Sequence, residues 1–175
     1  LFSDLDYLVG FHYLRPQDAG ENAWGLPIGF VRDGSGGEVA SLGFTCVACH
    51  TRELTSGGHT LRIDGAPADG SFFDFAYALR LALQRTLDDP ARFERFARRV
   101  LGAVYTTERA VALHAEVRHF TARFSTLLER SRSPVPYGYG RLDAFGILLN
   151  EIVGTGLGMP ENYRAAAAPV SYPHL

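Results

Sequence analysis

The strongest constraint on this chain is one pentapeptide that contains both of its cysteines. Residues 46–50 read Cys-Val-Ala-Cys-His, which is the C-x-x-C-H attachment signature of a c-type haem. Residues three apart lie on one face of a helical turn, so both thiols can reach the two vinyl groups along one edge of a porphyrin. The histidine comes next on the same turn, where its imidazole can ligate the iron. We therefore expect Cys46 and Cys49 to bind one haem c covalently and His50 to be the proximal iron ligand.

Paired cysteines also serve in redox dithiols, zinc sites and structural disulfides. A thioredoxin-like dithiol lies between a strand and a helix, whereas residues 36–43 before the motif have the composition of a loop. Zinc needs four ligands, and the chain has no second cysteine pair. These alternatives are therefore disfavoured. We also expect Thr45 to cap the turn, and Phe44, Val47 and Ala48 to offer apolar surface to the macrocycle.

Composition and charge exclude several partners. With 175 residues, of which 46% are apolar, the chain can bury one core. A net charge of −2 gives no indication of nucleic acid binding. No run approaches the roughly eighteen apolar residues of a membrane span, so we expect no transmembrane segment. Haem attachment normally comes after export, and we interpret the chain as a mature or trimmed product from the periplasm or cell exterior.

The pattern along the chain predicts one all-α, cytochrome-c-like domain over residues 1–175, with long ordered loops around one haem. We find no sustained strand alternation, which is the reason for the all-α class. In chain order we expect a loop-rich wrap, the haem attachment, an irregular stretch, a helical core and a C-terminal loop that we interpret as truncated: 1–45, 46–50, 51–70, 71–153 and 154–175.

Apolar residues at helical spacing predict four helices in that core. Asp89 and Pro90 form an N-cap and first-turn pair, and Gly102 is placed to stop the helix that they begin. The four expected helices cover 71–88, 90–102, 107–130 and 141–153.

The sixth iron ligand decides between an electron carrier and a reactive haem. Met159 is the only methionine, and it lies in a Gly-rich loop directly before Pro160, where a thioether can be presented to a haem face. The alternative for Met159 is an ordinary buried loop residue. A histidine in the sixth position and an open iron are also alternatives, and the sequence leaves all of them open. The histidines are His12, His59, His114, His119 and His174.

Other side chains are candidates for the haem surroundings. Arginine can donate two parallel hydrogen bonds to a carboxylate and tyrosine can donate one, so both residue types can bind haem propionates. The alternatives are solvated charge for the arginines and simple packing for the tyrosines. A cluster of phenylalanines can contact the porphyrin or pack in the core. In that order, the candidates are Arg52, Arg62 and Arg141, then Tyr137 and Tyr139, then Phe72, Phe73 and Phe75.

Six ordered segments resemble the N-terminal haem half of the rubber-oxygenase-like di-haem c-type cytochromes, a family distantly related to bacterial di-haem cytochrome c peroxidases. They are Leu26–Phe30, Leu42–Thr51, Arg62–Pro67, Thr86–Phe93, Gly140–Phe145 and Ala168–Leu175. The resemblance implies an exported, mostly helical protein whose N-terminal haem carries the reactive iron while a second haem passes electrons. Cys46 and Cys49 match the thioether cysteines and His50 matches the proximal ligand. The second C-x-x-C-H of the family is absent from this chain.

We therefore expect electron transfer in an exported redox system, with a redox partner protein or a second haem domain or subunit as the partner. The alternative is a haem-dependent oxygenase or peroxidase with an open iron site, normally paired with a second haem domain. A third class is a structural subunit whose haem mainly completes the fold.

Overall fold

The computed structural model describes residues 4–17, 24–33 and 41–166. The chain forms two compact units. The first contains the residues up to Phe75 together with Ser133–Asp143, and the second contains Ala76–Arg132 and Ala144–Ala166. Compactness alone does not make either unit an independent domain, so the expected single domain stays a prediction.

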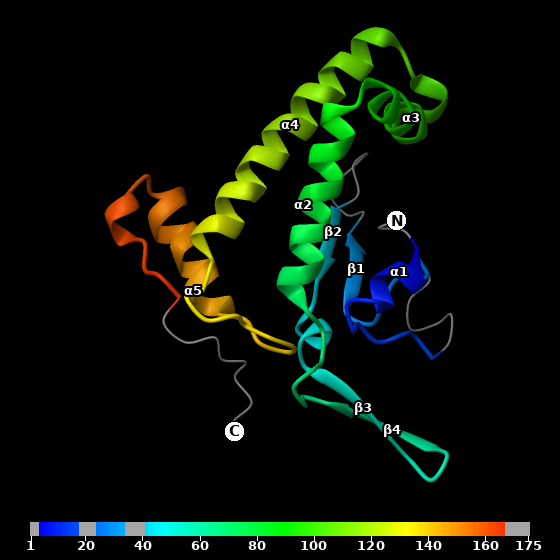
Figure 1. Cartoon of the computed structure of the whole chain (residues 1–175), viewed down its shortest axis with the longest axis vertical. Coiled ribbons are helices and arrows are strands. Elements are labelled where there is room, and N and C mark those ends of the chain that lie inside the picture. The colour runs from blue at the N-terminus through cyan, green and yellow to red at the C-terminus, as the bar shows by residue number, and fades with distance from the viewer. Residues whose placement is uncertain (1–3, 18–23, 34–40, 167–175) are drawn as a thin grey trace. The chain divides into compact units, whose positions relative to one another are not determined.

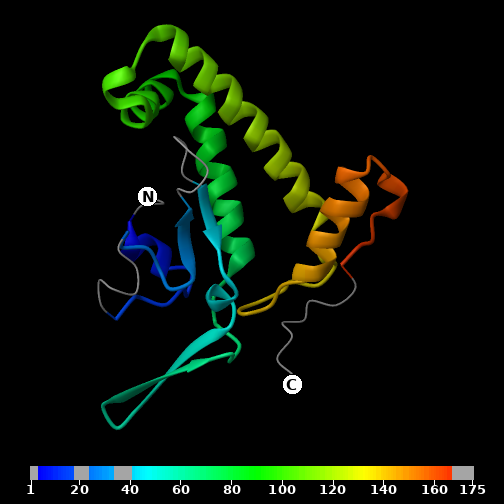
Figure 2. The same ribbon diagram turned by 180° about the vertical axis from the view of Figure 1, so that it is seen from behind.

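The first unit contains two antiparallel hairpins, and the predicted all-α class is therefore wrong (Figure 1). Strand β1 (Phe30–Asp33) pairs with β2 (Ser41–Phe44), and β3 (Thr51–Ser56) pairs with β4 (His59–Asp64). Figure 2 shows the same arrangement from behind, with the β3–β4 ribbon extending away from β1 and β2. The fold is a mixture of helices and short strands.

The second hairpin occupies a stretch that the sequence pattern predicts to be irregular. Gly57 and Gly58 join its strands, and both have positive φ angles, 57° and 79°. Two consecutive residues with positive φ form the type I′ turn that matches the twist of a hairpin, and glycine adopts that conformation without strain. The strands contain mostly threonines and charged residues, with Leu54, Leu61 and Ile63 as their apolar residues, so no sustained apolar alternation marks them.

Most of the helical predictions are confirmed. The long helices are α2 (Phe72–Asp88), α3 (Pro90–Leu101) and α4 (Thr107–Arg130). The side chain of Asp89 caps α3 by accepting from the backbone N–H groups of Ala91 and Arg92, at 2.9 and 3.1 Å.

The fourth expected helix, 141–153, differs from the structure at both ends. It begins as α5 (Ala144–Leu149) and continues as a π-helical segment, η3 (Asn150–Gly156). The first unit also has a short helix, α1 (Leu5–Val9), within the region expected to be a loop-rich wrap. No helix of the described residues is long and apolar enough to cross a membrane, as the sequence predicts.

An aromatic cluster forms the core of the first unit. Phe30, Phe75 and Tyr13 are 1%, 4% and 4% exposed. The Tyr13 ring meets the Phe30 ring edge to face, with the centroids 4.7 Å apart, and Phe44 lies 4.6 Å from Phe30. These residues come from β1, β2, the start of α2 and the segment after α1, so the cluster joins the elements that surround the C-x-x-C-H motif.

Candidate haem site

The C-x-x-C-H motif forms a tight turn between β2 and β3. Its first three residues are the 3₁₀ helix η1 (Cys46–Ala48), and the backbone N–H groups of Cys49 and His50 both donate to the Cys46 carbonyl, at 3.1 and 2.8 Å. Thr45 has the extended backbone of an N-cap, but its side chain makes no capping hydrogen bond, so that prediction is wrong. Its hydroxyl lies 3.3 Å from the Gly29 carbonyl, to which it donates instead.

Main-chain hydrogen bonds fix the end of this turn. The Gly65 N–H donates to the His50 carbonyl at 2.7 Å, and the Ala68 N–H donates to the Cys49 carbonyl at 3.1 Å. The hydroxyl of Thr51, which is 1% exposed, lies 2.8 Å from the His50 carbonyl and 3.0 Å from the Asp64 carboxylate. The base of the β3–β4 hairpin therefore holds the backbone of His50 in place.

Both thiols are free, and their surroundings differ. Cys46 is exposed, and Cys49 is half-buried. Burial raises the pKa of the Cys49 thiol, and the neighbouring Cys46 raises that pKa further. A nucleophilic redox cysteine needs the opposite shift.

The secondary structure around the thiols also differs from that of a thioredoxin-like dithiol. The approach to the motif is partly a strand, since β2 covers Ser41–Phe44, and the expectation of a loop over 36–43 is wrong there. The cysteines then lie on a three-residue 3₁₀ turn, in place of the α-helix whose N-terminus would stabilise a thiolate. The geometry therefore disfavours a redox dithiol.

Exposed apolar side chains lie next to Cys46 in the sequence. Leu42, Phe44 and Val47 are 53%, 42% and 39% exposed. Ala48 is different, because it is buried against Gly29. Apolar side chains gathered at one exposed segment commonly mark a surface that a ligand or partner covers.

The donor set of the turn fits a covalently bound haem. Two free thiols and an imidazole lie within five residues, and the His50 ring makes no hydrogen bond to any described residue. A porphyrin supplies four nitrogens to its iron, so the protein needs to add only axial ligands. Within the described residues, no three His, Cys, Asp or Glu side chains form a group that could hold a bare metal ion.

Tyr13 is a further residue of this region, and no sequence motif marks it. Its hydroxyl is buried and has no hydrogen-bond partner among the described residues. Burial raises the pKa of the phenol, and the nearby Cys49 thiol raises that pKa further. The surroundings of Tyr13 arise from tertiary packing, so no local signal in the sequence could have indicated them.

Met159 lies in the second unit, between η3 and the short 3₁₀ helix η4 (Pro160–Asn162). Its backbone N–H donates to the Gly154 carbonyl at 2.9 Å, and its carbonyl accepts from the Asn162 N–H at 3.0 Å. Its residue exposure is 41%, so the alternative of an ordinary buried methionine is wrong. The loop therefore fixes the backbone of Met159 while leaving the residue accessible.

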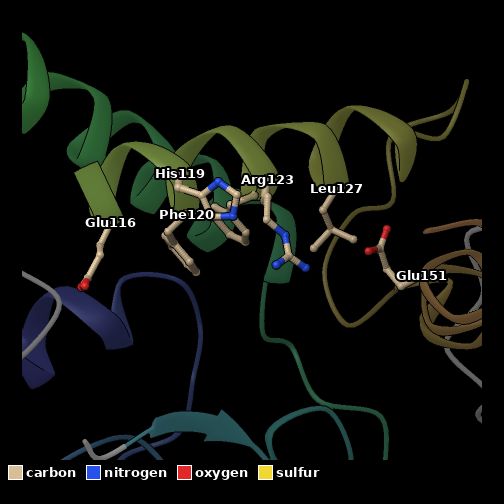
Figure 3. Close-up of a pocket in the computed structure, with 7 residues that line it drawn as sticks. Glu116, His119, Phe120, Arg123, Leu127 and Glu151 are labelled. Atoms are coloured by element: carbon tan, nitrogen blue, oxygen red, sulfur yellow. The ribbon is translucent and has the colours of Figure 1, made fainter. Parts of the chain in front are cut away.

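The candidate histidines have different surroundings. His12 and His59 are exposed, and His174 lies outside the described residues. His114 is half-buried, with its ring 4.6 Å from the Phe93 ring. His119 lines a pocket of about 420 Å³ (Figure 3). The pocket is bordered by one face of α4 and by one residue of η3, and its lining consists of Glu116, His119, Phe120, Arg123, Phe124, Leu127 and Glu151.

Two of the arginines proposed for propionates already bind carboxylates. Arg62 lies 2.7 Å from Glu53, and Arg52 lies 2.8 Å from Asp69. Arg141 is exposed.

The aromatic candidates divide between the core and the surface. Tyr137 is buried and stacks on Phe73 with the ring centroids 4.6 Å apart, whereas Tyr139 is exposed. Of the three phenylalanines, Phe75 belongs to the core, and Phe72 and Phe73 are half-buried.

Comparison with known proteins found a distant relative. A protein of Sinorhizobium fredii, named "Uncharacterized protein y4iJ", is 32% identical over 193 residues. The similarity covers 99% of this chain and 32% of that protein, so the chain spans about a third of the relative's length. No protein-family model matches the chain, and no solved structure matches it.

Proposed function

We propose that this chain binds one haem c through Cys46 and Cys49, with His50 as the proximal ligand, and that it transfers electrons in an exported redox system. The observation that carries the proposal is the C-x-x-C-H turn, in which both thiols are free and the backbone of His50 is held by hydrogen bonds. When bound, a haem supplies an iron centre that gains and loses single electrons.

The residues of the chain have separate roles in this proposal. Cys46 and Cys49 hold the cofactor, and Gly65 and Thr51 keep the backbone of His50 in position by donating hydrogen bonds to its carbonyl. Phe44 and Val47 cover one surface of the cofactor and exclude water from it. A site of low dielectric with a fixed axial histidine sets the reduction potential of the iron.

Met159 is our proposed sixth ligand. Its support is the loop geometry, in which hydrogen bonds from both directions fix the backbone and the residue remains accessible. A thioether in the sixth position closes the iron to small molecules and leaves electron transfer as its activity.

The partner in this proposal is a second haem domain or a separate redox protein, in the periplasm or outside the cell. This part of the proposal rests on the resemblance of the six segments to a di-haem family, in which a second haem passes electrons to the N-terminal one. The greater length of the Sinorhizobium relative leaves room for a further domain in that protein.

The test is expression of the chain behind an export signal in bacteria that contain a cytochrome c maturation system. Mass spectrometry of the denatured protein should show the mass of the chain plus one haem. The double variant Cys46→Ala/Cys49→Ala should show the bare chain mass. A bare mass for the wild-type chain, in cells that load a control c-type cytochrome, would contradict the proposal. Optical spectra with and without carbon monoxide then distinguish a closed iron from the open site of an oxygenase or peroxidase.

A further inference from the structure

The buried hydroxyl of Tyr13 has no partner among the described residues, and the chemistry of the site suggests one. We infer that Tyr13 is a positioning residue, whose hydroxyl oxygen accepts a hydrogen bond from the free ring N–H of His50 when haem is attached. The inference rests on the proposed haem function and goes beyond it, because it assigns a residue that sets the orientation and donor strength of the axial ligand.

The first observation is that the Tyr13 hydroxyl is unsatisfied. The residue is 4% exposed, and its hydroxyl oxygen has no hydrogen-bond partner among the described residues. Buried polar groups are almost always hydrogen-bonded in folded proteins, so an exception calls for an explanation. A phenylalanine would pack in the same aromatic cluster without this cost, since only the hydroxyl distinguishes the two side chains.

The second observation is the location of the ring. Tyr13 packs against Phe30, and a Cβ added to Gly70 would lie 2.9 Å from its Cε1 atom. That same added Cβ would lie 3.6 Å from the carbonyl oxygen of Ala48, inside the attachment motif. One edge of the tyrosine ring therefore lies close to the turn, and the phenol is near enough to Cys49 for the two groups to interact electrostatically.

The third observation concerns the acceptors around His50. A histidine that ligates a metal almost always donates its other ring N–H to a carbonyl, a carboxylate or water. Two carbonyls of the turn already take two donors each: Cys46 from two N–H groups, and His50 from an N–H and a hydroxyl. Among the described residues, neither the His50 ring nor the Tyr13 hydroxyl has a hydrogen-bond partner.

A hydrogen bond between them would have two effects. It would fix the tautomer and the rotation of the His50 ring, which places the other ring nitrogen toward the iron. It would also make the imidazole a stronger donor, which favours the ferric state and so lowers the reduction potential.

The experiment compares Tyr13→Phe with Tyr7→Phe in the haem-loaded protein. Tyr7 is the matched control, because its half-buried ring belongs to the same unit and meets Phe11 edge to face at 5.3 Å. Tyr13→Phe should raise the reduction potential and accelerate the exchange of the His50 ring N–H with water. NMR measures this exchange in the reduced low-spin protein, with carbon monoxide added if the iron has an open position. Tyr7→Phe should change neither quantity.

The denaturation midpoint independently indicates whether the Tyr13 hydroxyl is hydrogen-bonded. If the hydroxyl is bonded in the loaded protein, Tyr13→Phe lowers the midpoint, whereas removal of an unsatisfied hydroxyl raises it. An unchanged potential together with a raised midpoint overturns the inference. A lowered midpoint with an unchanged potential also overturns it, because the partner is then a water or another group.

Two further outcomes keep the test decisive. If Tyr13→Phe fails to fold, the wild-type protein suffices: the His50 ring N–H should show a nuclear Overhauser effect to the Tyr13 ring protons, and its absence overturns the inference. If mass spectrometry finds no haem on the wild-type chain, the proposed function itself fails, and this is known before any variant is compared.

Discussion

Gly29 lies directly against Ala48, so that the backbone before β1 and the C-x-x-C-H turn touch without an intervening side chain. A Cβ added to Gly29 would overlap the Ala48 nitrogen and lie 2.7 Å from the Ala48 Cβ. The φ angle of Gly29 is also positive, at 82°. Glycine is required here for two independent reasons, the backbone conformation and the close approach. Because Gly29 directly precedes the core residue Phe30, this contact packs the C-x-x-C-H turn next to the aromatic cluster.

Gly29→Ala should therefore destabilise the fold and reduce haem loading. We expect a loss of roughly 2–5 kcal/mol from the left-handed backbone and the steric overlap together. The matched control is Gly58→Ala, where φ is 79° but nothing lies within 4 Å of an added Cβ. That variant should lose only about 1 kcal/mol, for the backbone alone. Urea unfolding measures both, and equal losses would show that the Gly29 contact contributes nothing.

The turn formed by the C-x-x-C-H motif is predictable from the sequence because it is local. Cys46, Cys49 and His50 lie within five residues, so their spacing alone places them on one turn. The α3 helix is predictable for a similar reason, since Asp89 and Pro90 mark its start and apolar residues recur at helical spacing. Local chemistry determines both features, and the sequence displays it directly.

The two hairpins and the unsatisfied hydroxyl of Tyr13 could not be predicted from the sequence, for different physical reasons. The strand β1 has four residues, which is too short for an alternating pattern to be distinguished from chance. The β3–β4 hairpin does carry a signal, the Gly57-Gly58 pair between two threonine-containing runs, but polar runs around glycines are also typical of loops. The unsatisfied hydroxyl of Tyr13 depends on Phe30 and Gly70, which are distant in sequence, so no local pattern could indicate it.

Asn150 should hold the loop that contains Met159. Its side-chain amide donates to the Arg164 carbonyl at 2.8 Å and accepts from the Arg164 N–H at 3.0 Å. Asn150→Ala removes both bonds and should cost about 1–3 kcal/mol. Asn150→Asp keeps the acceptor but replaces the donating NH2 with a carboxylate oxygen that faces the Arg164 carbonyl, so its loss should be at least as large. Limited proteolysis within 157–163 should be faster in both variants than in the wild-type protein, and equal rates in all three proteins would contradict this role.

Asp89 should make stability depend on pH in acid. The backbone N–H of Arg92 is the largest cause that holds the pKa of Asp89 below its usual value of 3.8, and the N–H of Ala91 acts in the same direction. Because the folded pKa is the lower one, the contribution of the charged cap is complete above the unfolded pKa and is lost as the pH falls through the folded pKa.

Asp89→Asn separates charge from capping, because asparagine is also a good N-cap but does not titrate. The wild-type protein should lose stability more steeply than this variant as the pH falls below about 4, with urea unfolding monitored by circular dichroism. Asp88→Asn is the control, since Asp88 is the neighbouring residue and does not cap α3. The same steepness in the wild-type protein and Asp89→Asn would contradict the prediction.

Replacement of Met159 tests the sixth ligand directly. Met159→Leu keeps the volume of the side chain and removes the sulfur, so a low-spin iron should become high-spin and should bind carbon monoxide. Met159→Ala should give the same spectrum, which would separate loss of the ligand from a change of packing. Met159→His offers a different ligand at the same position and should restore a low-spin spectrum with a lower potential, since imidazole favours the ferric state more than a thioether does. A low-spin spectrum that is unchanged in both Met159→Leu and Met159→Ala would show that another group closes the iron, and a high-spin wild-type protein would show that nothing does.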